Sequence, residues 1–528
     1  MSENKSFKLT YSTMFNPPQE LHDKFDAALL KAKDNFGKEY PMIINGKERY
    51  SEAKHQAYSP VNRDWLLGTF QKGSAQDVDD AIAAARKAFP AWRLMDWEER
   101  VYLLRKFADI ITERIFDISV VTALEVGKNR MESLGEVAEA ADLVRFACDQ
   151  MEKAHGFVNM LASDPLVGFT STNQNVLKPY GVWAVISPFN FPAALTFGPA
   201  GAALIAGNTV VMKPATDTSL TVTLMVEAMR DAGLPDGVFN LVTGSGSVIG
   251  KVLTDPTKVD GITFTGSKEV GMGIFHKFGE GRYVKPAILE LGGKNPTIVS
   301  KNADIEDAAL GIVRSAFGLS GQKCSACSRV FVERPVYDEL VTRIAELTEK
   351  LSVGDPSLQS TYMGTVINKK AHEDYQTFAA ELKEAGRLLT GGELLTGGDY
   401  AKGYFVTPTV VVDVPLEHRL WREEMFLPIL MIAPVDSIEE GMRLANDTEY
   451  GLTAGFFGTD AECEWFFDHI EAGVVYANRP QGSTTGAWPG YQPFGGWKGS
   501  GSSGKNGGGL YYVQLYMHEQ NRTFVHHV

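Results

Sequence analysis

Short apolar runs alternate with longer amphipathic stretches through the middle of the chain. Apolar runs of this length predict strands that are buried on both faces. The amphipathic stretch 219–232 lies between two of the runs and predicts a helix that ends at Gly233. The alternation predicts a parallel, doubly wound α/β sheet, an architecture suited to dinucleotide binding. The runs, each bounded by Gly, Pro, Asn or Asp, lie at residues 182–186, 209–212, 239–242 and 261–264.

A second alternation follows and predicts a second α/β domain. The tail at 511–516, rich in Tyr, Val and Leu, predicts one further strand. The nearby sequence offers it no partner strand, so we expect it to pair with another subunit. The expected strands of the second domain lie at residues 288–291, 297–299 and 330–332, and its expected helices at 305–317 and 336–351.

Upstream of the first sheet, the sequence predicts a hairpin and a set of helices. Residues 43–48 contain an Asn-Gly dipeptide, which favours a tight turn between two short strands. The segment Ser74-Ala-Gln-Asp77 predicts a capping box that opens a helix over 78–89, and we expect Pro90 to end this helix. The stretch 97–153 has apolar residues three and four positions apart and predicts several long helices.

The composition excludes several classes of partner. The chain has 528 residues, 44% of them hydrophobic and 22% charged, which is typical of globular proteins. Its 51 Lys and Arg against 65 Asp and Glu give a net charge of -14, which argues against nucleic acid or an anionic membrane as a partner. Pro, Gly and Asn interrupt the long apolar stretch 189–212, so we do not expect it to cross a membrane.

The four cysteines lack the spacing of a disulfide framework or of a zinc site. Reduced thiols are typical of the cytoplasm. The N-terminus has neither the apolar run of a secretory signal nor the Arg-rich pattern of a mitochondrial transit peptide. We therefore expect a cytoplasmic protein, with the mitochondrial matrix as the alternative for a mature eukaryotic chain.

Cys324 is a candidate nucleophile, because small and polar residues surround it and Lys323 precedes it. A neighbouring ammonium can lower the pKa of a thiol, which makes it more reactive. The alternative is a cysteine that fills space as a small hydrophobic side chain. Cys327 adds a redox or metal interpretation, but no second Cys or His pair completes a site, so we predict no metal.

Two further residues could act together with a cysteine nucleophile, one as a base and one as a hydrogen-bond donor. Glu290 ends an expected strand, where burial would raise its pKa towards that of a general base. The alternative is a structural ion pair, for example with Lys294. Asn190 lies between two prolines after another strand, and its amide can donate to a developing oxyanion, although an Asn there can also cap the next helix.

Phosphate or ribose contacts are predicted more weakly. Lys213 ends a third strand and could reach a cofactor. Glycines stand between a strand and a helix at 244–250 and again at 264–271, as a phosphate-binding turn requires. Neither glycine spacing matches the GxGxxG pattern of dinucleotide-binding turns, so each segment alone is weak evidence for phosphate binding.

Seven motifs in this order resemble the NAD(P)-dependent aldehyde dehydrogenase superfamily, from about residue 40 to the C-terminus. They are PFNFP at 188–192, VVMKP at 210–214, FTGS at 264–267, ELGGK at 290–294, GQKC at 321–324, EEMF at 423–426 and PFGG at 493–496.

The resemblance implies an α/β fold with two doubly wound domains and a small β-strand arm for oligomerisation. It implies a dinucleotide-binding domain at 1–165 and 180–290, a catalytic domain at 291–485, and an arm at 166–179 and 505–528. The expected assembly is a homo-oligomer, a dimer or higher, with a small-molecule aldehyde as substrate and NAD as cofactor.

The resemblance also implies the roles of individual residues. Cys324 attacks the aldehyde carbon, the Cys324 backbone N–H and the Asn190 amide bind the oxyanion, and Glu290 activates the water that hydrolyses the resulting thioester. The implied cofactor-binding residues are Ser187, Phe189, Lys213, Gly246, Gly266, Ser267, Glu424 and Phe426.

A narrower resemblance points to the 1-pyrroline-5-carboxylate dehydrogenases of proline catabolism. It is carried by Cys324-Ser-Ala-Cys-Ser-Arg329, Thr485-Gly-Ala487 and Gln492-Pro-Phe-Gly-Gly496. The implied reaction oxidises L-glutamate γ-semialdehyde to L-glutamate. The resemblance implies that the Ser325 hydroxyl and the Gly486 and Ala487 backbone amides hold the α-carboxylate of the substrate. It also implies that Phe191 and Phe494 form the apolar walls of the substrate pocket.

The sequence departs from the pattern of these families at three places, which leaves alternatives for the cofactor and the substrate pocket. Thr216 stands where many NAD-specific members have Glu, which leaves NADP as an alternative cofactor. Leu427 replaces a common Gly, and the loop 488–491 is unusually aromatic, which bears on the cofactor geometry and the pocket. The alternative functions are a dehydrogenase for another carboxylate-bearing semialdehyde and a catalytically silent member that acts as a binding or structural protein.

Overall fold

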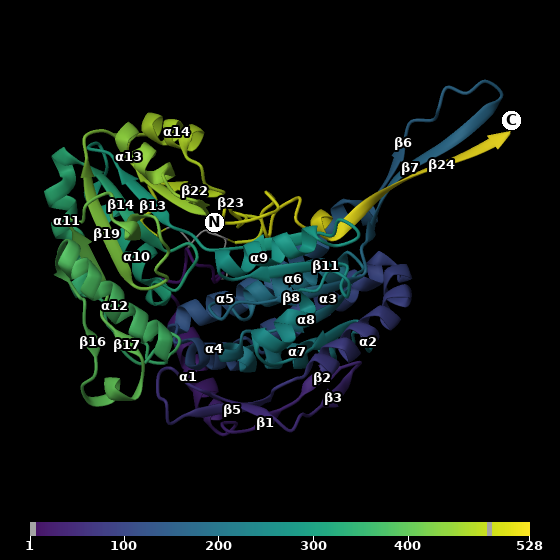
Figure 1. The fold of residues 1–528 in the computed structure, drawn as a ribbon, viewed down its shortest axis with the longest axis horizontal. Helices are drawn as coiled ribbons and strands as arrows, with labels where there is room; N and C mark the ends of the chain where they lie inside the picture. The colour runs from purple at the N-terminus through teal and green to yellow at the C-terminus, as the bar shows by residue number, and fades with distance from the viewer. Residues whose placement is uncertain (1–6, 483–487, 528) are drawn as a thin grey trace, which may run out of the picture.

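The computed structural model describes residues 7–482 and 488–527. Figure 1 shows two bodies, one on each side of the view, and a thin arm of strands that projects from one of them. Each body is built on a seven-stranded sheet.

The first sheet combines five parallel strands with an antiparallel hairpin at one edge, in the order β12-β11-β8-β9-β10-β2-β3. The predicted strands are confirmed, and so is the hairpin, whose turn residues Asn45 and Gly46 have φ of 53° and 72°. The hairpin extends the sheet, with Ile43 opposite Leu241, and this pairing was not predicted. The strands are β2 (Met42–Ile44), β3 (Lys47–Arg49), β8 (Val182–Ile186), β9 (Thr209–Lys213), β10 (Phe239–Leu241), β11 (Gly261–Thr265) and β12 (Ala287–Glu290).

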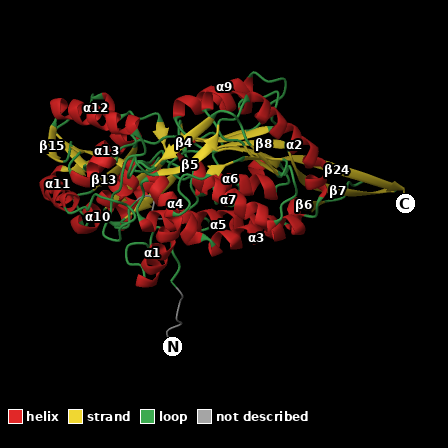
Figure 2. Cartoon of the chain, turned by 90° about the horizontal axis from the view of Figure 1, so that it is seen from below, coloured by secondary structure: helices red, strands yellow, loops and turns green. Residues whose placement is uncertain are grey.

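Alternate residues of each strand enter two different cores. Val182 and Ala184 of β8 pack in the core that contains α2 and α9, whereas Trp183 and Val185 pack in the core of α3, α5, α6 and α7. Figure 2 shows these two groups of helices on opposite sides of the strands. Covering both faces explains why the strands are continuous apolar runs. The helices are α2 (Ala75–Leu94), α3 (Trp97–Glu113), α5 (Arg130–Lys153), α6 (Ala194–Ile205), α7 (Ser219–Ala232) and α9 (Lys268–Gly279).

The second sheet has the order β15-β18-β19-β14-β13-β21-β22 and is parallel except for β15. Val330 and Val332 of β14 pack with α10 and α11, and Phe331 packs on the other face with α12, α13 and α14. The predicted second alternation is confirmed from residue 297 onward. The expected strand at 288–291 was wrongly assigned to this domain, because it pairs with β11 as edge strand β12 of the first sheet. The elements are β13 (Asn295–Val299), β14 (Cys327–Glu333), β15 (Arg387–Thr390), β18 (Thr409–Val412), β19 (Ile429–Val435), β21 (Thr453–Phe457), β22 (Val474–Ala477), α10 (Ile305–Phe317), α11 (Arg334–Glu349), α12 (Lys369–Ala385), α13 (Ile438–Asn446) and α14 (Asp460–His469).

Helix α2 begins directly after the predicted cap Ser74, earlier than the expected 78, and also ends later than predicted. The capping box of Ser74 and Asp77 is confirmed, since each side chain accepts from the backbone N–H of the other. The expectation that Pro90 ends the helix was wrong. The turn after Pro90 carries Trp92, which is 1% exposed and donates its Nε1–H to the Leu204 carbonyl at 3.1 Å. Burial of this ring offsets the backbone hydrogen bond that a proline cannot make.

The arm is a three-stranded antiparallel sheet of β6 (Val158–Leu161), β7 (Phe169–Pro179) and β24 (Met517–His527), with β7 in the middle. The expected strand at 511–516 was wrong, because Val513–Tyr516 forms a 3-10 turn. Tyr512 and Tyr516, four positions apart, join their hydroxyls at 2.9 Å, a spacing that suits a helical turn. The strand that follows, β24, pairs with β7 of the same chain along its whole length.

The other elements connect or cover these units. The several long helices expected over 97–153 are confirmed as α3, α4 and α5. Over the residues that the structure describes, no helix is both long and apolar enough to cross a membrane. The proposed domain limits stay predictions. The remaining elements are α1 (Gln19–Lys33), α4 (Ile115–Val126), α8 (Lys251–Leu253), β1 (Glu39–Tyr40), β4 (Lys54–Tyr58), β5 (Leu66–Gln71), β16 (Leu394–Leu395), β17 (Phe405–Val406), β20 (Tyr450–Gly451) and β23 (Trp497–Lys498).

Candidate active site

A cavity of about 780 Å³ opens at the carboxyl ends of β8, β9, β11 and β12. This edge is where open α/β sheets bind ligands, because the loops that follow the strands can diverge there. Every residue predicted to bind the cofactor lines this cavity, and so do the three predicted catalytic residues. The predicted residues in its wall are Ser187, Phe189, Asn190, Lys213, Gly246, Gly266, Ser267, Glu290, Cys324, Glu424 and Phe426.

A smaller cavity of about 80 Å³ lies on the other side of Cys324. The predicted substrate contacts Phe191, Ser325 and Phe494 line it. Cys324 and Glu290 line both cavities, so they stand at the junction between the two. Two more predicted substrate contacts, Gly486 and Ala487, lie outside the described residues.

The loop before Cys324 has an unusual backbone. Leu319 and Ser320 have φ of 50° and 52°, a conformation that costs a residue with a side chain about 1–3 kcal/mol. Glu132 of α5 holds the loop by accepting the Leu319 N–H at 2.8 Å. Gly321, with φ of 66°, lies so close to the Leu427 carbonyl that a methyl group would not fit. Leu427, noted for replacing a common glycine, thus contacts the nucleophile loop through its backbone.

Cys324 is the only one of the four cysteines that is not buried. Cys327, in contrast, is a buried side chain that fills space, and its Sγ lies 3.3 Å from the Thr297 hydroxyl. The expectation that Lys323 lowers the thiol pKa was wrong. Burial, together with the nearby Glu424 and Glu290 carboxylates, raises the pKa of Cys324.

The Lys323 ammonium lies instead in a small pocket with Glu132, where Gly318 leaves room for it and which Cys324 does not line. Cys324 is therefore a protonated thiol in this arrangement, and its reaction requires a base to take the proton.

Glu290 is the base that the cavity offers. Burial raises the pKa of Glu290 to about 8, in the direction expected. The alternative ion pair with Lys294 is absent among the described residues, where Glu290 Oε2 and Lys294 Nζ both lack a hydrogen-bond partner. A buried carboxylate without a fixed partner is free to exchange a proton with a ligand.

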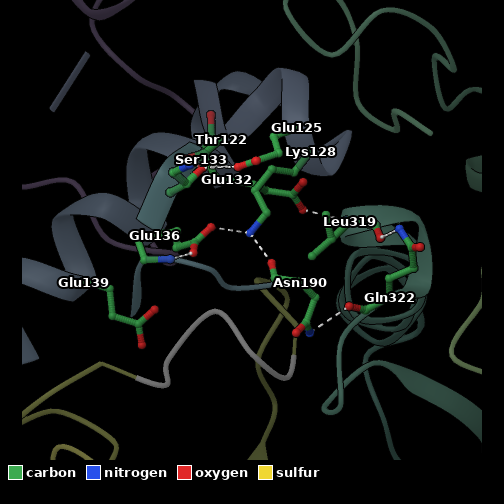
Figure 3. Close-up of polar contacts among 12 residues, drawn as sticks. Thr122, Glu125, Lys128, Glu132, Ser133, Glu136, Glu139, Asn190, Leu319 and Gln322 are labelled. Atoms are coloured by element: carbon green, nitrogen blue, oxygen red, sulfur yellow. Dashed lines mark hydrogen bonds and ion pairs between the residues drawn. The ribbon is translucent and has the colours of Figure 1, made fainter. Parts of the chain in front are cut away.

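Asn190 is held through both its side chain and its backbone, as Figure 3 shows. Its side-chain amide donates to the Gln322 backbone carbonyl at 2.9 Å, and its backbone carbonyl accepts from Lys128 Nζ at 2.7 Å. The amide has two hydrogens, so the bond to Gln322 leaves one for a ligand. The alternative role as a helix cap was wrong, because Ala193 is the N-cap of α6 and no side chain caps that helix.

Sequence reasoning missed the residues that support this loop. Lys128 also bonds Glu136 at 2.6 Å with both side chains fully buried, and Glu136 accepts the Ala193 N–H at 2.7 Å. Asn295 donates to the Cys324 carbonyl at 2.7 Å and so fixes the nucleophile's backbone. The sequence signal that could have indicated them is the spacing of Lys128, Glu132 and Glu136, four positions apart around the start of α5.

We expect Lys128→Met to destabilise the protein by about 3–5 kcal/mol, because it leaves the Glu136 carboxylate buried without its partner. Urea unfolding measures the change. Lys24→Met is the matched control, since Lys24 and Glu20 also lie 2.6 Å apart but are exposed, and we expect it to cost less than about 1 kcal/mol. Equal unfolding midpoints for the two variants would contradict this account.

The larger cavity has the features that a dinucleotide requires. A methyl group added at Gly246 would meet no atom within 4 Å, so the backbone there faces open space. Among the described residues, the only hydrogen bond of Lys213 Nζ is to the neighbouring Pro214 carbonyl, at 2.8 Å. Burial lowers the pKa of Lys213 to about 8. Glu424 accepts the Gly293 N–H at 2.8 Å, and the Phe189 and Phe426 rings meet edge to face at 5.8 Å. Ser267 caps the N-terminus of α9 at the same edge, where anions bind well.

Comparison with known proteins gives consistent matches over nearly the whole chain. Residues 48–521 match the model of the Aldehyde dehydrogenase family. The chain is 39% identical over 504 residues to 1-pyrroline-5-carboxylate dehydrogenase 1 of Halalkalibacterium halodurans, covering 94% of this chain and 95% of that protein. It is 38% identical to 1-pyrroline-5-carboxylate dehydrogenase of Geobacillus kaustophilus, covering 95% of each chain. Among solved structures, 1-pyrroline-5-carboxylate dehydrogenase from Thermus with bound NAD superposes with a TM-score of 0.92 at 32% identity, covering 98% of this chain and 99% of that one.

Proposed function

Because this chain belongs to the aldehyde dehydrogenase family, we propose that it oxidises L-glutamate γ-semialdehyde to L-glutamate with NAD, in proline degradation. The observation that carries the proposal is the position of Cys324 and Glu290 at the junction of a dinucleotide-sized cavity and a small one. A thiol at that point lies between a cofactor on one side and a short aldehyde on the other.

The proposed chemistry begins when Cys324 Sγ gives its proton to Glu290, which passes it to solvent, and the sulfur attacks the aldehyde carbon. An S–C bond forms, and the electron pair of the carbonyl moves to its oxygen, which the Asn190 amide and the Cys324 N–H stabilise. When bound, NAD supplies the acceptor for the hydride that leaves this carbon. Cys324 then carries a thioester. Glu290 takes a proton from water, whose oxygen attacks the thioester carbon. The C–S bond then breaks, the acid is released, and the Cys324 sulfur takes the proton back from Glu290.

The cofactor is proposed to be held by the residues that line the larger cavity. Lys213 and Glu424 offer a cation and a carboxylate for the two riboses, and Gly246, Gly266 and Ser267 line the wall beside which the phosphates would lie. Thr216, whose hydroxyl donates to the Gly244 carbonyl at 3.4 Å, has no carboxylate of its own to bind ribose hydroxyls, so use of NADP is part of the test.

The substrate is proposed to lie in the smaller cavity. Phe191 and Phe494 would contact its methylene groups, and the Ser325 hydroxyl would bind its α-carboxylate. Ser325 is 1% exposed, so a carboxylate bound there is shielded from water and its hydrogen bonds are strengthened.

Steady-state rates with NAD and NADP on a panel of semialdehydes test the proposal. We expect kcat/KM for L-glutamate γ-semialdehyde with NAD to exceed that for succinate or glutarate semialdehyde. Ser325→Ala should raise KM by about tenfold for substrates with an α-carboxylate and leave it unchanged for those without, because one charged-group hydrogen bond is lost. Higher kcat/KM for succinate or glutarate semialdehyde would instead favour the alternative dehydrogenase.

We also propose a homo-oligomer assembled through the arm, and a cytoplasmic location. The arm carries exposed apolar side chains, among them Met160, Val167 and Phe524, at 64%, 96% and 63% exposed. Apolar surface on a projecting sheet favours burial against a partner. A monomeric mass in analytical ultracentrifugation at micromolar concentration would refute the assembly.

A further inference from the structure

One wall of the smaller cavity comes from the N-terminal segment 7–16, outside both sheets. Tyr11 lines this cavity together with Cys324, Phe191 and Trp488. The Tyr11 ring is 8% exposed and meets the Phe191 and Trp488 rings edge to face, with centroids 6.4 and 5.5 Å apart. Three aromatic rings therefore form one continuous side of the cavity.

A hydrogen bond fixes the direction of the Tyr11 ring. Its hydroxyl donates to Glu139 Oε2 at 2.6 Å, and Glu139 projects from α5 and also lines the cavity. Burial raises the pKa of Tyr11, so the hydroxyl keeps its proton and remains a donor. The ring cannot turn away from the cavity without breaking this bond in a buried place.

Helix α5 provides a place for the ring. Gly135 lies inside this helix, where glycine costs roughly 1 kcal/mol relative to alanine. A methyl group at Gly135 would lie 3.0 Å from Tyr11 Cε1 and 3.3 Å from its Cδ1. The missing side chain therefore lets the Tyr11 ring lie directly on the helix.

The residues that follow Tyr11 bind the other body of the protein. Ser12 Oγ accepts from Arg479 at 2.7 Å, and the Arg314 guanidinium lies over the Phe15 ring at 3.9 Å. Tyr11 itself bonds α5 of the first body. The segment is thus attached to both sides of the cavity, which makes its ring a fixed wall.

We propose that Tyr11 is a specificity-determining residue, whose ring closes the cavity beside Cys324 and favours short aldehydes over longer ones. The inference rests on the proposed dehydrogenase activity. A long aldehyde chain must overlap the ring or displace it, which costs the edge contacts with Phe191 and Trp488 and the bond to Glu139. A short chain fits between the ring and Cys324 without this cost.

The test compares propanal and hexanal with NAD for the wild type and for variants of Tyr11. In Tyr11→Ala the ratio of kcat/KM for hexanal to that for propanal should rise by about tenfold, with KM for NAD unchanged. Tyr11→Phe keeps the ring, and we expect its ratio to stay within about twofold of the wild type. Tyr102→Ala, at a side chain 66% exposed on α3, is the matched control and should not change the ratio.

An unchanged ratio in folded Tyr11→Ala would overturn the proposal, and so would an equal rise in Tyr11→Phe. If Tyr11→Ala does not fold, Gly135→Ala takes its place, because its methyl group moves the ring while alanine favours the helix. We expect Gly135→Ala to shift the ratio by about threefold or more, and an unchanged ratio there would overturn the proposal. A wild type without activity on any aldehyde would refute the proposed function instead.

Discussion

Cys324→Ala is expected to lower kcat by about 10⁴-fold or more while leaving the affinity for NAD intact. Removal of a nucleophile abolishes the covalent route, and what remains is catalysis by binding and polarisation alone. The larger cavity keeps its shape, because Asn295 holds the backbone of residue 324 and not its side chain. Steady-state kinetics gives the first quantity, and fluorescence titration with NAD gives the second.

Cys327→Ala is the matched control for this experiment. Its thiol is buried beside Thr297 and lines neither of the two cavities. We expect it to keep most of the turnover, at a modest cost in stability for a small buried side chain. If Cys327→Ala were inactive and Cys324→Ala active, the choice of nucleophile would be wrong.

Glu290→Gln is expected to slow both halves of the reaction, because Glu290 is the proposed base for the Cys324 thiol and for the water. Loss of a general base slows each step by about 10²–10⁴-fold. Rapid mixing should then show slow NADH formation in the first turnover, without a burst. A variant with wild-type steady turnover would show that Glu290 is not the base.

The same carboxyl group should set the pH dependence of the wild type. Since the pKa of Glu290 is about 8, the carboxylate that accepts a proton becomes the major form only above that pH. The rate should therefore rise with pH, by about tenfold between about pH 7 and pH 9, and level off above. In Glu290→Gln this rise should be lost. A rise that persisted in the variant would assign it to another group.

The strands and helices could be predicted because their patterns are local. The four apolar runs of the first sheet became β8 to β11, and Gly233 ended α7 in the left-handed conformation as expected. The errors arose where a distant contact decided the outcome. Pro90 stays inside a helix because Trp92 reaches Leu204 far along the chain. The 511–516 stretch forms a turn because Tyr512 and Tyr516 point together into the core.

The residues of the candidate site also fall into those that local motifs predicted and those that depend on distant contacts. Motifs located Cys324, Glu290 and Asn190, whose placement around one cavity the structure describes. The pKa of Cys324 was mispredicted because adjacency in sequence does not give the direction of the Lys323 ammonium. The contribution of Tyr11 to the smaller cavity was beyond sequence reasoning, since nothing near residue 11 indicates that it meets α5.

The arm has a consequence for the order in which the chain folds during synthesis. Asn175 of β7 and Glu519 of β24 bond across the arm although they are 344 positions apart. At roughly 5–20 residues per second, a ribosome needs roughly 17–70 s to make the chain between them. During that time β7 has β6 on one edge and nothing from its own chain on the other. The nascent protein therefore presents an open strand edge until β24 emerges from the ribosome, and the arm can be completed only then.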